Sequence, residues 1–396
     1  MISFDEARAR LFTMAHPLGK EPVALAKAAG RVLAEAVVAR VDSPPRDVST
    51  MDGYAVRSAD LEEPPVRLRI VSEVFAGADD PGSIASGECA RIFTGAPIPA
   101  HADRVVVQEV VEKDGDCAVF ADAPSPGRNI RVRAGDFAAG TALLTEGTLL
   151  GPRQMVAAAA ADLAEVTCWR RPRVRLLATG DELADPGSAR GRPGAIPESI
   201  SFGVDALVVR HGGEFCGTLR LGDDLAAMER AAGEALRQSD LVVVSGGASV
   251  GERDFAKAAF DPHGLDLLFA KVAIKPGKPV WLGKAAGKLV LGLPGNPTSA
   301  LVTARLFLAP LVAGLAGRPA APGDAWTTMV LGSPLGANGD REAFIRARRS
   351  DDGRVYPLDN QDSGAQHALA YADVLLRSPA HAQALPAGAS VPGIEF

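Results

Sequence analysis

Four glycine turns carry most of the residues in this sequence that could perform chemistry. They are Thr179-Gly180-Asp181-Glu182, Gly222-Asp223-Asp224, Ser245-Gly246-Gly247 and Pro294-Gly295-Asn296-Pro297, and each follows an apolar run. Glycine lets the main chain approach a ligand, and a helix that starts after such a turn offers unpaired N–H groups to an anion. Because open α/β sheets bind ligands beyond the carboxyl ends of their strands, the turns predict one shared site for a phosphate-bearing ligand. For any single turn, a simple helix cap is the more ordinary explanation.

Carboxylates accompany these turns at Asp181, Glu182, Asp223, Asp224 and Asp254. A carboxylate repels a phosphate group, so a site that contains both requires a bridging cation. Oxygen ligands beside a phosphate favour Mg²⁺. The sequence therefore predicts a magnesium ion at this edge of the sheet, and it leaves open which of Asp223 and Asp224 faces the ligand.

Two lysines stand three residues apart in Lys275-Pro276-Gly277-Lys278. Prolines restrict this segment, and two fixed ammonium groups suit an oxyanion such as phosphate, sulfate or a metal oxyanion. Solvated lysines on a loop explain the same residues equally well. In a predicted β-rich stretch, Asp52-Gly53 and Thr94-Gly95 are polar positions in irregular loops, where plain turns into strands are the alternative.

A different chemistry is suggested by Gly247-Ala248-Ser249-Val250-Gly251, which matches the G-x-S-x-G pattern of a hydrolase nucleophile. His211-Gly212-Gly213 superficially matches an oxyanion-hole segment. The general base would be one of three later histidines, His263, His367 or His381. However, Gly212 is placed as the C-cap of a predicted helix, and none of the later histidines follows a core strand. This esterase hypothesis also leaves the acidic turns without a role, so it is the weaker one.

The apolar pattern indicates which elements position these residues. Residues 2–40 have a spacing that predicts two helices, residues 45–150 contain short runs that predict strands, and residues 152–164 predict a further helix. Four apolar strands follow, with amphipathic helices between or after them: 173–180, 214–221, 240–247 and 288–295. This alternation is typical of a mostly parallel, doubly wound α/β sheet covered on both faces.

Other segments are connections or smaller units. Residues 168–174 and 317–325 are predicted linkers, and 325–396 predict a final module of short strands. The segment 283–288 resembles a phosphate-binding P-loop, but it has one spacer residue too few and predicts a hairpin turn.

Composition excludes several classes of function. The chain has 396 residues, of which 47% are hydrophobic and 23% charged, and its formal net charge is −6. Scattered Lys and Arg without a basic cluster argue against a nucleic-acid partner. We find no apolar stretch of about 18–20 residues and no secretory signal, which predicts a cytoplasmic protein without a membrane span. The histidines lack metal-ligand spacing, and the cysteines lack C-x-x-C spacing and are predicted to be small buried residues: Cys89, Cys117, Cys168 and Cys216.

Seven segments, in chain order, resemble the molybdopterin molybdenumtransferase family, the MoeA-type enzymes related to the large domain of gephyrin. They are MDGYAVR, RIFTGAPIPAHADRVVVQE, GRNIRVRAGDF, LLATGDEL, SGGASVGERD, VAIKPGKP and LPGNPTSA. The resemblance covers nearly the whole chain, whereas residues 173–317 alone are similar to other molybdopterin-binding domains too. It implies an α/β multidomain protein, with a central molybdopterin-binding domain between an N-terminal helical and β-rich region and a C-terminal β module. The expected domains are 1–45 with 140–171, 46–139, 172–318 and 319–396.

The resemblance implies Mg²⁺-dependent insertion of molybdenum from molybdate into adenylylated molybdopterin, with release of AMP. The implied catalytic residues are Asp52, Thr94, Glu182 and Asp254, and the implied Mg²⁺ ligands are Glu182, Asp223, Asp224 and Asp254. The residues implied to hold the nucleotide-bearing pterin are Thr179, Gly180, Asp181, Ser245, Gly246, Gly247, Ser249, Pro294, Gly295, Asn296 and Pro297. The implied molybdate pocket consists of Lys275, Lys278, Ser299, Ser363 and either Arg341 or Arg346.

The resemblance also implies partners. Family members are homodimers, so Asp52 and Thr94 are expected to act in trans on the α/β domain of the other subunit, and a molybdopterin adenylyltransferase is a further expected partner. A scaffold that keeps the fold only to bind other proteins is the alternative from a different class. The chain departs from the family pattern at four positions, Arg46, Val48, Ile200 and Asp362. The last is expected to place a negative charge beside the oxyanion pocket.

Overall fold

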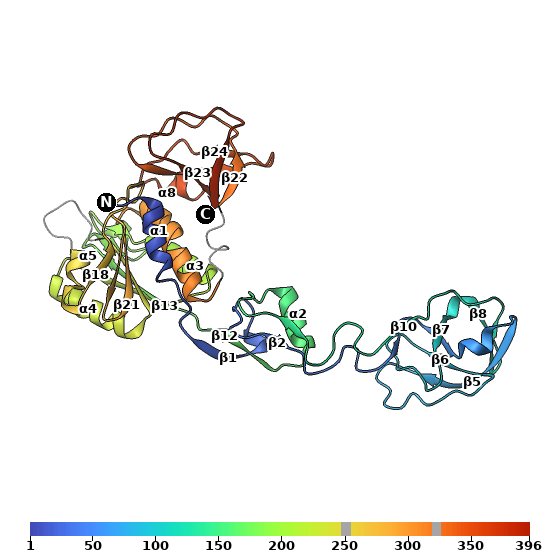
Figure 1. Ribbon diagram of the computed structural model, residues 1–396. Coiled ribbons are helices and arrows are strands. Elements are labelled where there is room, and N and C mark those ends of the chain that lie inside the picture. The colour runs from blue at the N-terminus through green and yellow to red at the C-terminus, as the bar shows by residue number, and fades with distance from the viewer. Residues whose placement is uncertain (247–254, 319–325) are drawn as a thin grey trace.

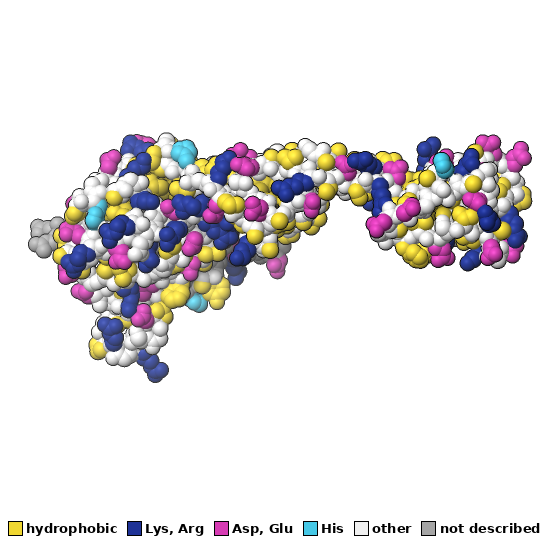
Figure 2. Space-filling model, turned by 90° about the horizontal axis from the view of Figure 1, so that it is seen from below, with side chains coloured by type: hydrophobic (Ala, Val, Ile, Leu, Met, Phe, Trp, Pro, Cys, Tyr) yellow, Lys and Arg dark blue, Asp and Glu magenta, His cyan; other side chains and the backbone are white. Residues whose placement is uncertain are grey.

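The computed structural model describes residues 1–246, 255–318 and 326–396. The molecule is elongated, with an α/β body and a C-terminal β module at one end and a β-rich body at the other (Figure 1). A small body built from β1 (Lys20–Ala24), β2 (Val37–Val38), β12 (Glu165–Trp169) and α2 (Pro152–Ala160) lies between them, and two extended segments connect it to the β-rich body. Basic and acidic side chains are intermingled along the whole face seen in Figure 2. The multidomain α/β architecture expected from the sequence is confirmed.

The central sheet has the strand order β16-β13-β17-β21-β20-β18. Its members are β16 (Glu214–Leu221), β13 (Arg173–Thr179), β17 (Leu241–Ser245), β21 (Lys288–Leu293), β20 (Trp281–Ala285) and β18 (Asp266–Phe269). The first four strands are mutually parallel, β20 pairs antiparallel with β21, and β18 pairs antiparallel with β20 at the edge of the sheet. All four predicted strands are confirmed. The P-loop-like segment 283–288 is the β20–β21 hairpin, as predicted.

Helices cover both faces of this sheet because the strand residues alternate between two cores. Leu176 and Val243 pack in one core, and Leu177 and Val242 pack in the other. The first core also receives α1 (Phe4–Phe12), α3 (Ile200–Arg210), α6 (Pro297–Thr303), η6 (Ala304–Leu308) and α7 (Ala309–Leu315). The second receives α4 (Leu225–Gln238) and α5 (Phe255–Ala258). This two-sided coverage is what a doubly wound sheet requires.

One apolar helical segment is longer than predicted from the sequence. The helical stretch Pro297–Leu315 has the length and hydropathy of a membrane span, so the prediction that no such stretch exists was wrong. However, 94% of it is buried inside the α/β body, where α6, η6 and α7 form part of the core. Burial on all sides explains why this helix is apolar all round.

The structure of the small middle body differs from the prediction of two helices in residues 2–40. Of the two helices predicted in residues 2–40 only α1 forms, because β1 (Lys20–Ala24) pairs antiparallel with β12 (Glu165–Trp169). Since β12 extends to Trp169, the predicted linker 168–174 is shorter than expected. The other elements are η1 (Leu25–Lys27), β2 (Val37–Val38), β11 (Ala142–Leu144) and α2 (Pro152–Ala160), the last being the helix predicted at 152–164. Cys168 is buried here and Cys89 in the β-rich body, but Cys117 and Cys216 are partly exposed, contrary to the prediction.

The β-rich body contains a six-stranded sheet with the order β7-β4-β6-β5-β9-β8. These strands are β4 (Gly53–Val56), β5 (Val66–Val74), β6 (Glu88–Ile92), β7 (Arg104–Val107), β8 (Val111–Asp114) and β9 (Cys117–Phe120). Its smaller elements are β3 (Val48–Ser49), β10 (Ile130–Arg131), η2 (Ser58–Leu61) and η3 (Gln108–Val110). The strand-rich pattern predicted for 45–150 is therefore confirmed.

The C-terminal module is a sheet with the order β19-β23-β25-β26-β22, and β24 pairs with β23. Its elements are β22 (Thr327–Val330), β23 (Glu342–Arg349), β24 (Val355–Pro357), α8 (Gln366–Leu369), β25 (Val374–Ser378) and β26 (Ser390–Glu395). The first strand in the order, β19 (Ile274–Lys275), comes from the α/β part of the chain. The remaining elements are β14 (Leu183–Ala184), β15 (Ile196–Pro197), η4 (Ala189–Gly191) and η5 (Asp261–His263). The proposed domain boundaries remain predictions.

Candidate active site

Three of the four glycine turns meet at the carboxyl edge of the central sheet. The Thr179 hydroxyl donates to the carbonyl of Ser245 at 3.3 Å, which ties the turn after β13 to the turn after β17. Gly246 has φ +87°, and a Cβ there would lie 2.4 Å from the Thr179 carbonyl oxygen. A Cβ on Gly295, after β21, would lie 3.3 Å from the Cα of Gly246. The glycines are therefore required by close backbone packing, and they leave the turns side by side.

The fourth turn joins the same edge through Asp181. Its Oδ1 accepts a hydrogen bond from the N–H of Asp223 at 3.2 Å, and a Cβ on Gly222 would lie 2.6 Å from that oxygen. The carboxylate of Glu182 folds back over Gly180, where a Cβ would lie 2.6 Å from Glu182 Oε2. The polar turns after β13 and β16 therefore form one acidic surface.

The acidic side chains of this surface differ in their roles. Asp224 is the N-cap of α4 and accepts a hydrogen bond from the N–H of Ala227 at 3.2 Å, whereas Asp223 contributes its N–H to Asp181. No three acidic, histidine or cysteine side chains form a ready metal cluster in the part of the chain that the structure describes. Gly247, Ser249 and Asp254 lie outside the described residues.

The two lysines lie on a segment that contacts both the α/β body and the C-terminal module. Lys275 is in β19 and is paired in parallel with Ala343 of β23. Gly277, at φ +105°, packs so closely on the helix α6 that a Cβ would lie 2.2 Å from Thr303 Cγ2. Lys275 and Lys278 are exposed, and Ser299, on α6, is only 5% exposed.

The C-terminal module reaches the glycine turns through a side-chain hydrogen bond. Asn296 Nδ2 donates to the hydroxyl of Ser363 at 3.0 Å. Of the two candidate arginines, Arg341 is half-buried and its Nε lies 3.8 Å from Asp340 Oδ1. Arg346 is 0% exposed and donates to the carbonyls of the loop that carries Ser363. Burial lowers the pKa of Arg346, and the negative charge of Asp362 opposes that effect.

Asp52 and Thr94 form a pair in the β-rich body. The Thr94 N–H and hydroxyl donate to Asp52 Oδ1 at 2.7 and 2.8 Å. These bonds, with the nearby Arg91 guanidinium, hold the pKa of Asp52 below its usual range. Gly53 is required beside them because a Cβ would lie 2.0 Å from the Val106 carbonyl oxygen. The β-rich body lies at the far end of the molecule from the glycine turns, so one chain does not bring the two groups together (Figure 1).

Comparison with known proteins shows which family has this combination of domains. Residues 2–161 match the model of the MoeA N-terminal region (domains I and II), 175–314 match a probable molybdopterin binding domain, and 328–396 match the MoeA C-terminal region (domain IV). A molybdopterin molybdenumtransferase of Haemophilus influenzae is 38% identical over 80% of this chain and 78% of its own length. The chain belongs to the molybdopterin molybdenumtransferase family.

Further relatives match most or all of the chain. Molybdopterin molybdenumtransferase 2 of Mycobacterium tuberculosis is 36% identical over 82% of each chain. The crystal structure of a molybdopterin biosynthesis MoeA protein from Pyrococcus horikoshii is 29% identical, with a TM-score of 0.86 over 100% of this chain and 99% of that one. The family expected from the sequence is thus confirmed.

The four positions that were expected to depart from the family pattern each have a defined local setting. Arg46 donates to the carbonyls of Ala78 and Asp79 within the β-rich body, and Val48 lies in β3, paired with β10. Ile200 begins α3 and packs against the core. Asp362 Oδ1 accepts a hydrogen bond from the Gly364 N–H at 2.7 Å.

The esterase hypothesis receives no support from the described residues. His211 follows α3 as its C-cap and is buried, with Nδ1 2.8 Å from the Leu207 carbonyl oxygen. Burial lowers the pKa of His211 to about 4. Gly212 follows with φ +92°, as expected at the end of a helix. This segment therefore terminates a helix on the core and does not form an oxyanion hole after a strand.

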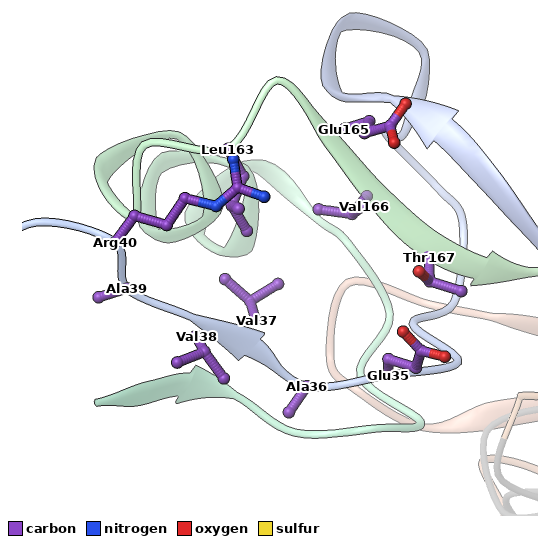
Figure 3. A pocket seen from close by; sticks show the side chains of 10 residues that line it. All are labelled: Glu35, Ala36, Val37, Val38, Ala39, Arg40, Leu163, Glu165, Val166 and Thr167. Carbon is purple, nitrogen blue, oxygen red and sulfur yellow. The ribbon is translucent and has the colours of Figure 1, made fainter. Parts of the chain in front are cut away.

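A separate pocket of about 420 Å³ lies in the small middle body between β2 and β12 (Figure 3). Apolar side chains such as Val37 and Val166 line it, with Glu35, Arg40 and Glu165 at its margins. None of its lining residues is a predicted site residue. This pocket is therefore distinct from the edge of the sheet where the glycine turns meet.

Sequence reasoning missed Gln361. Its side chain makes hydrogen bonds to the backbone of Arg346, fifteen residues earlier in the chain. A glutamine in a loop carries no local signal of this kind. Only the pairing of β23 with β24 could have indicated it.

Proposed function

We propose that this protein inserts molybdenum from molybdate into adenylylated molybdopterin and releases AMP, completing the molybdenum cofactor. Membership of the family supports a transferase with a role in molybdenum cofactor biosynthesis. The observation that carries the finer proposal is the convergence of the turns after β13, β17 and β21 with Ser363 of the C-terminal module. Glycine turns at the carboxyl edge of a parallel sheet let the main chain approach a nucleotide-bearing ligand.

The proposed pterin site uses the glycine turns, and the proposed molybdate pocket lies beside them. Backbone groups of Thr179, Gly180, Ser245, Gly246, Gly295 and Asn296 would hold the phosphate and nucleotide. Lys275, Lys278, Ser299 and Ser363 would meet molybdate, since ammonium and hydroxyl groups bind an oxyanion by charge-assisted hydrogen bonds. Support comes from the placement of β19, which brings Lys275 next to β23 of the module that carries Ser363.

We further propose that the reaction requires Mg²⁺, held by Glu182, Asp254 and one of Asp223 and Asp224. The donor chemistry fits, because carboxylate oxygens are the ligands Mg²⁺ prefers. Support comes from the turns after β13 and β16, which place Asp181 beside the main chain of Asp223 and fold Glu182 over Gly180. When bound, Mg²⁺ would neutralise phosphate charge and make AMP a better leaving group.

The site is proposed to be shared between two subunits of a homodimer. Asp52 is ionised and fixed by Thr94, yet it lies in the β-rich body, far from the turns of its own chain. A second copy would supply this carboxylate in trans. A molybdopterin adenylyltransferase, which would supply the adenylylated substrate, is a further proposed partner, and the proposed location is the cytoplasm.

The decisive assay is AMP release. Purified protein, adenylylated molybdopterin, Mg²⁺ and molybdate should together release AMP, and omission of molybdate or chelation of the metal should stop it. Ser249→Ala should keep most of this activity, because the proposed role of that turn belongs to its backbone. Absence of molybdate-dependent AMP release in the complete mixture would refute the proposed function.

A mixing experiment tests the shared site. Asp52→Asn and Lys275→Ala should each be inactive alone, whereas random mixed dimers contain one intact site. After dissociation and reassociation at equal amounts, the mixture should regain about a quarter of the wild-type activity. A mixture that stays inactive, although mixed dimers are shown to form, would place both residues in a site within one chain.

A further inference from the structure

The loop that carries Ser363 is shaped largely by its own side chains. It connects β24 to α8 and spans residues 358–365. Asn360 Oδ1 accepts a hydrogen bond from the Asp362 N–H at 2.9 Å, and Asp362 Oδ1 accepts one from the Gly364 N–H at 2.7 Å. Turns of this kind set the local path of the chain. They do not determine where the loop lies on the molecule, which requires contacts to another element.

Gln361 attaches the loop to β23. Its Oε1 accepts from the N–H and Nε of Arg346 at 3.1 and 3.4 Å. Its Nε2 donates to the carbonyls of Arg346 and Leu358 at 2.9 and 2.8 Å. Beyond the pair of Ala347 and Pro357, the Leu358 N–H donates to the Arg346 carbonyl at 2.9 Å, and the Gln361 amide bridges the Arg346 N–H and the Leu358 carbonyl. The side chain thus links the loop both to β23 and to the residue that follows β24.

The guanidinium of Arg346 fixes the loop on either side of Gln361. Its Nη2 donates to the carbonyls of Asn360 and Asp362 at 3.2 and 3.1 Å. The remaining nitrogen, Nη1, is buried without a hydrogen-bond partner in the described part of the chain. Because Arg346 is 0% exposed, a dissolved anion cannot reach its guanidinium while the loop is in place.

Strand β23 also sets the position of Lys275. Ala343 pairs with Lys275, and Arg346 lies three residues further along the same strand, about 10 Å away. The loop held by Arg346 then places the Ser363 hydroxyl 3.0 Å from Asn296 Nδ2. One strand therefore determines the spacing between the lysine and the serine of the proposed molybdate pocket.

We propose that Gln361 and Arg346 are positioning residues, which hold Ser363 against Asn296 at a fixed spacing from Lys275. Arg346 then acts on molybdate through this loop and not by direct contact. The inference rests on the proposed function, since it assigns how the molybdate pocket of that function is held. It also explains how Asp362 is accommodated there, because its carboxylate bonds to the Gly364 N–H and lies near the buried guanidinium.

Gln361→Leu tests this proposal, since leucine has a similar volume and makes none of the four hydrogen bonds. The KM for molybdate should rise roughly tenfold to a hundredfold, because a small displacement of a binding group has effects of this size. The affinity for the adenylylated pterin should change less than twofold, and a high molybdate concentration should restore turnover. Gln361→Glu keeps the acceptor and loses the donor, so its KM should be intermediate. Gln366→Leu, on exposed α8, is the matched control and should resemble the wild type.

Hydrogen exchange provides a readout that does not need the reaction. Amides of 358–365 should exchange faster in Gln361→Leu than in the wild type, while those of β13 and β17 should not change. Faster exchange with an unchanged KM for molybdate would overturn the positioning role. A parallel loss of pterin affinity, molybdate affinity and thermal stability would overturn it too, since it would indicate general damage to the fold. If the wild type released no AMP, the proposed function would fail, whereas the exchange result would still test whether Gln361 orders the loop.

Discussion

Replacing Gly246 by alanine should push apart the glycine turns after β13 and β17. The cost of this displacement can be measured separately from the cost of backbone strain at a positive φ. At φ +87° an alanine costs about 1–2 kcal/mol relative to glycine. The new Cβ would also lie 2.4 Å from the Thr179 carbonyl oxygen and 2.7 Å from its hydroxyl, so the turns after β13 and β17 must separate. Overpacking of this kind adds about 1–3 kcal/mol. The expected loss in the free energy of unfolding is therefore about 2–5 kcal/mol.

Gly287 is the matched control. It has φ +74° in the β20–β21 hairpin, and a Cβ there meets nothing within 4 Å, so Gly287→Ala should cost only the conformational part, about 1–2 kcal/mol. Urea denaturation of both variants measures the difference, and equilibrium binding of the adenylylated pterin should weaken only in Gly246→Ala. Equal destabilisation of the two variants, with unchanged pterin binding, would refute the argument that Gly246 is required by the close approach of two ligand turns.

Two further predictions concern single side chains. Because burial holds the pKa of His211 at about 4, the unfolded chain takes up a proton below its ordinary pKa of 6.5 while the folded one does not. The free energy of unfolding should thus fall between pH 6.5 and 4 by up to roughly 3 kcal/mol, and urea denaturation of His211→Gln should show a flatter pH profile. Asp224→Ala should lower the free energy of unfolding by about 1 kcal/mol, because the N-cap of α4 is lost, whereas Asp223→Ala should not. Thermal unfolding of the two variants distinguishes them, and equal values would contradict the capping role.

The parts of the site that follow strands could be predicted from the sequence. Each of β13, β16, β17 and β21 is an apolar run that ends at a glycine turn, and parallel strands must carry their C-terminal turns to one edge. The role of Asp224 could also have been found, since an aspartate directly before an amphipathic helix is a favoured N-cap.

The parts that depend on distant partners could not be predicted. Residues 20–24 have an apolar spacing compatible with a helix, and they become β1 only because β12, more than a hundred residues away, offers a paired edge. The burial of Arg346 and the role of Gln361 likewise follow from the pairing of β23 with β24. The spacing of apolar residues within a segment does not indicate which distant strand will pair with it. Tertiary contacts can therefore override the local preference of the segment.

The arrangement of the sheets implies that the two halves of the proposed site can be perturbed separately. Lys275 belongs to the α/β part of the chain, yet it lies in the sheet of the C-terminal module, and that module also holds Ser363. A displacement of this sheet would therefore move both groups together relative to Asn296, while Thr179 and Gly246 stay packed against each other in the central sheet. Substitutions within the C-terminal module should consequently weaken the binding of molybdate more than the binding of the pterin, since the glycine turns do not depend on β23 for their shape.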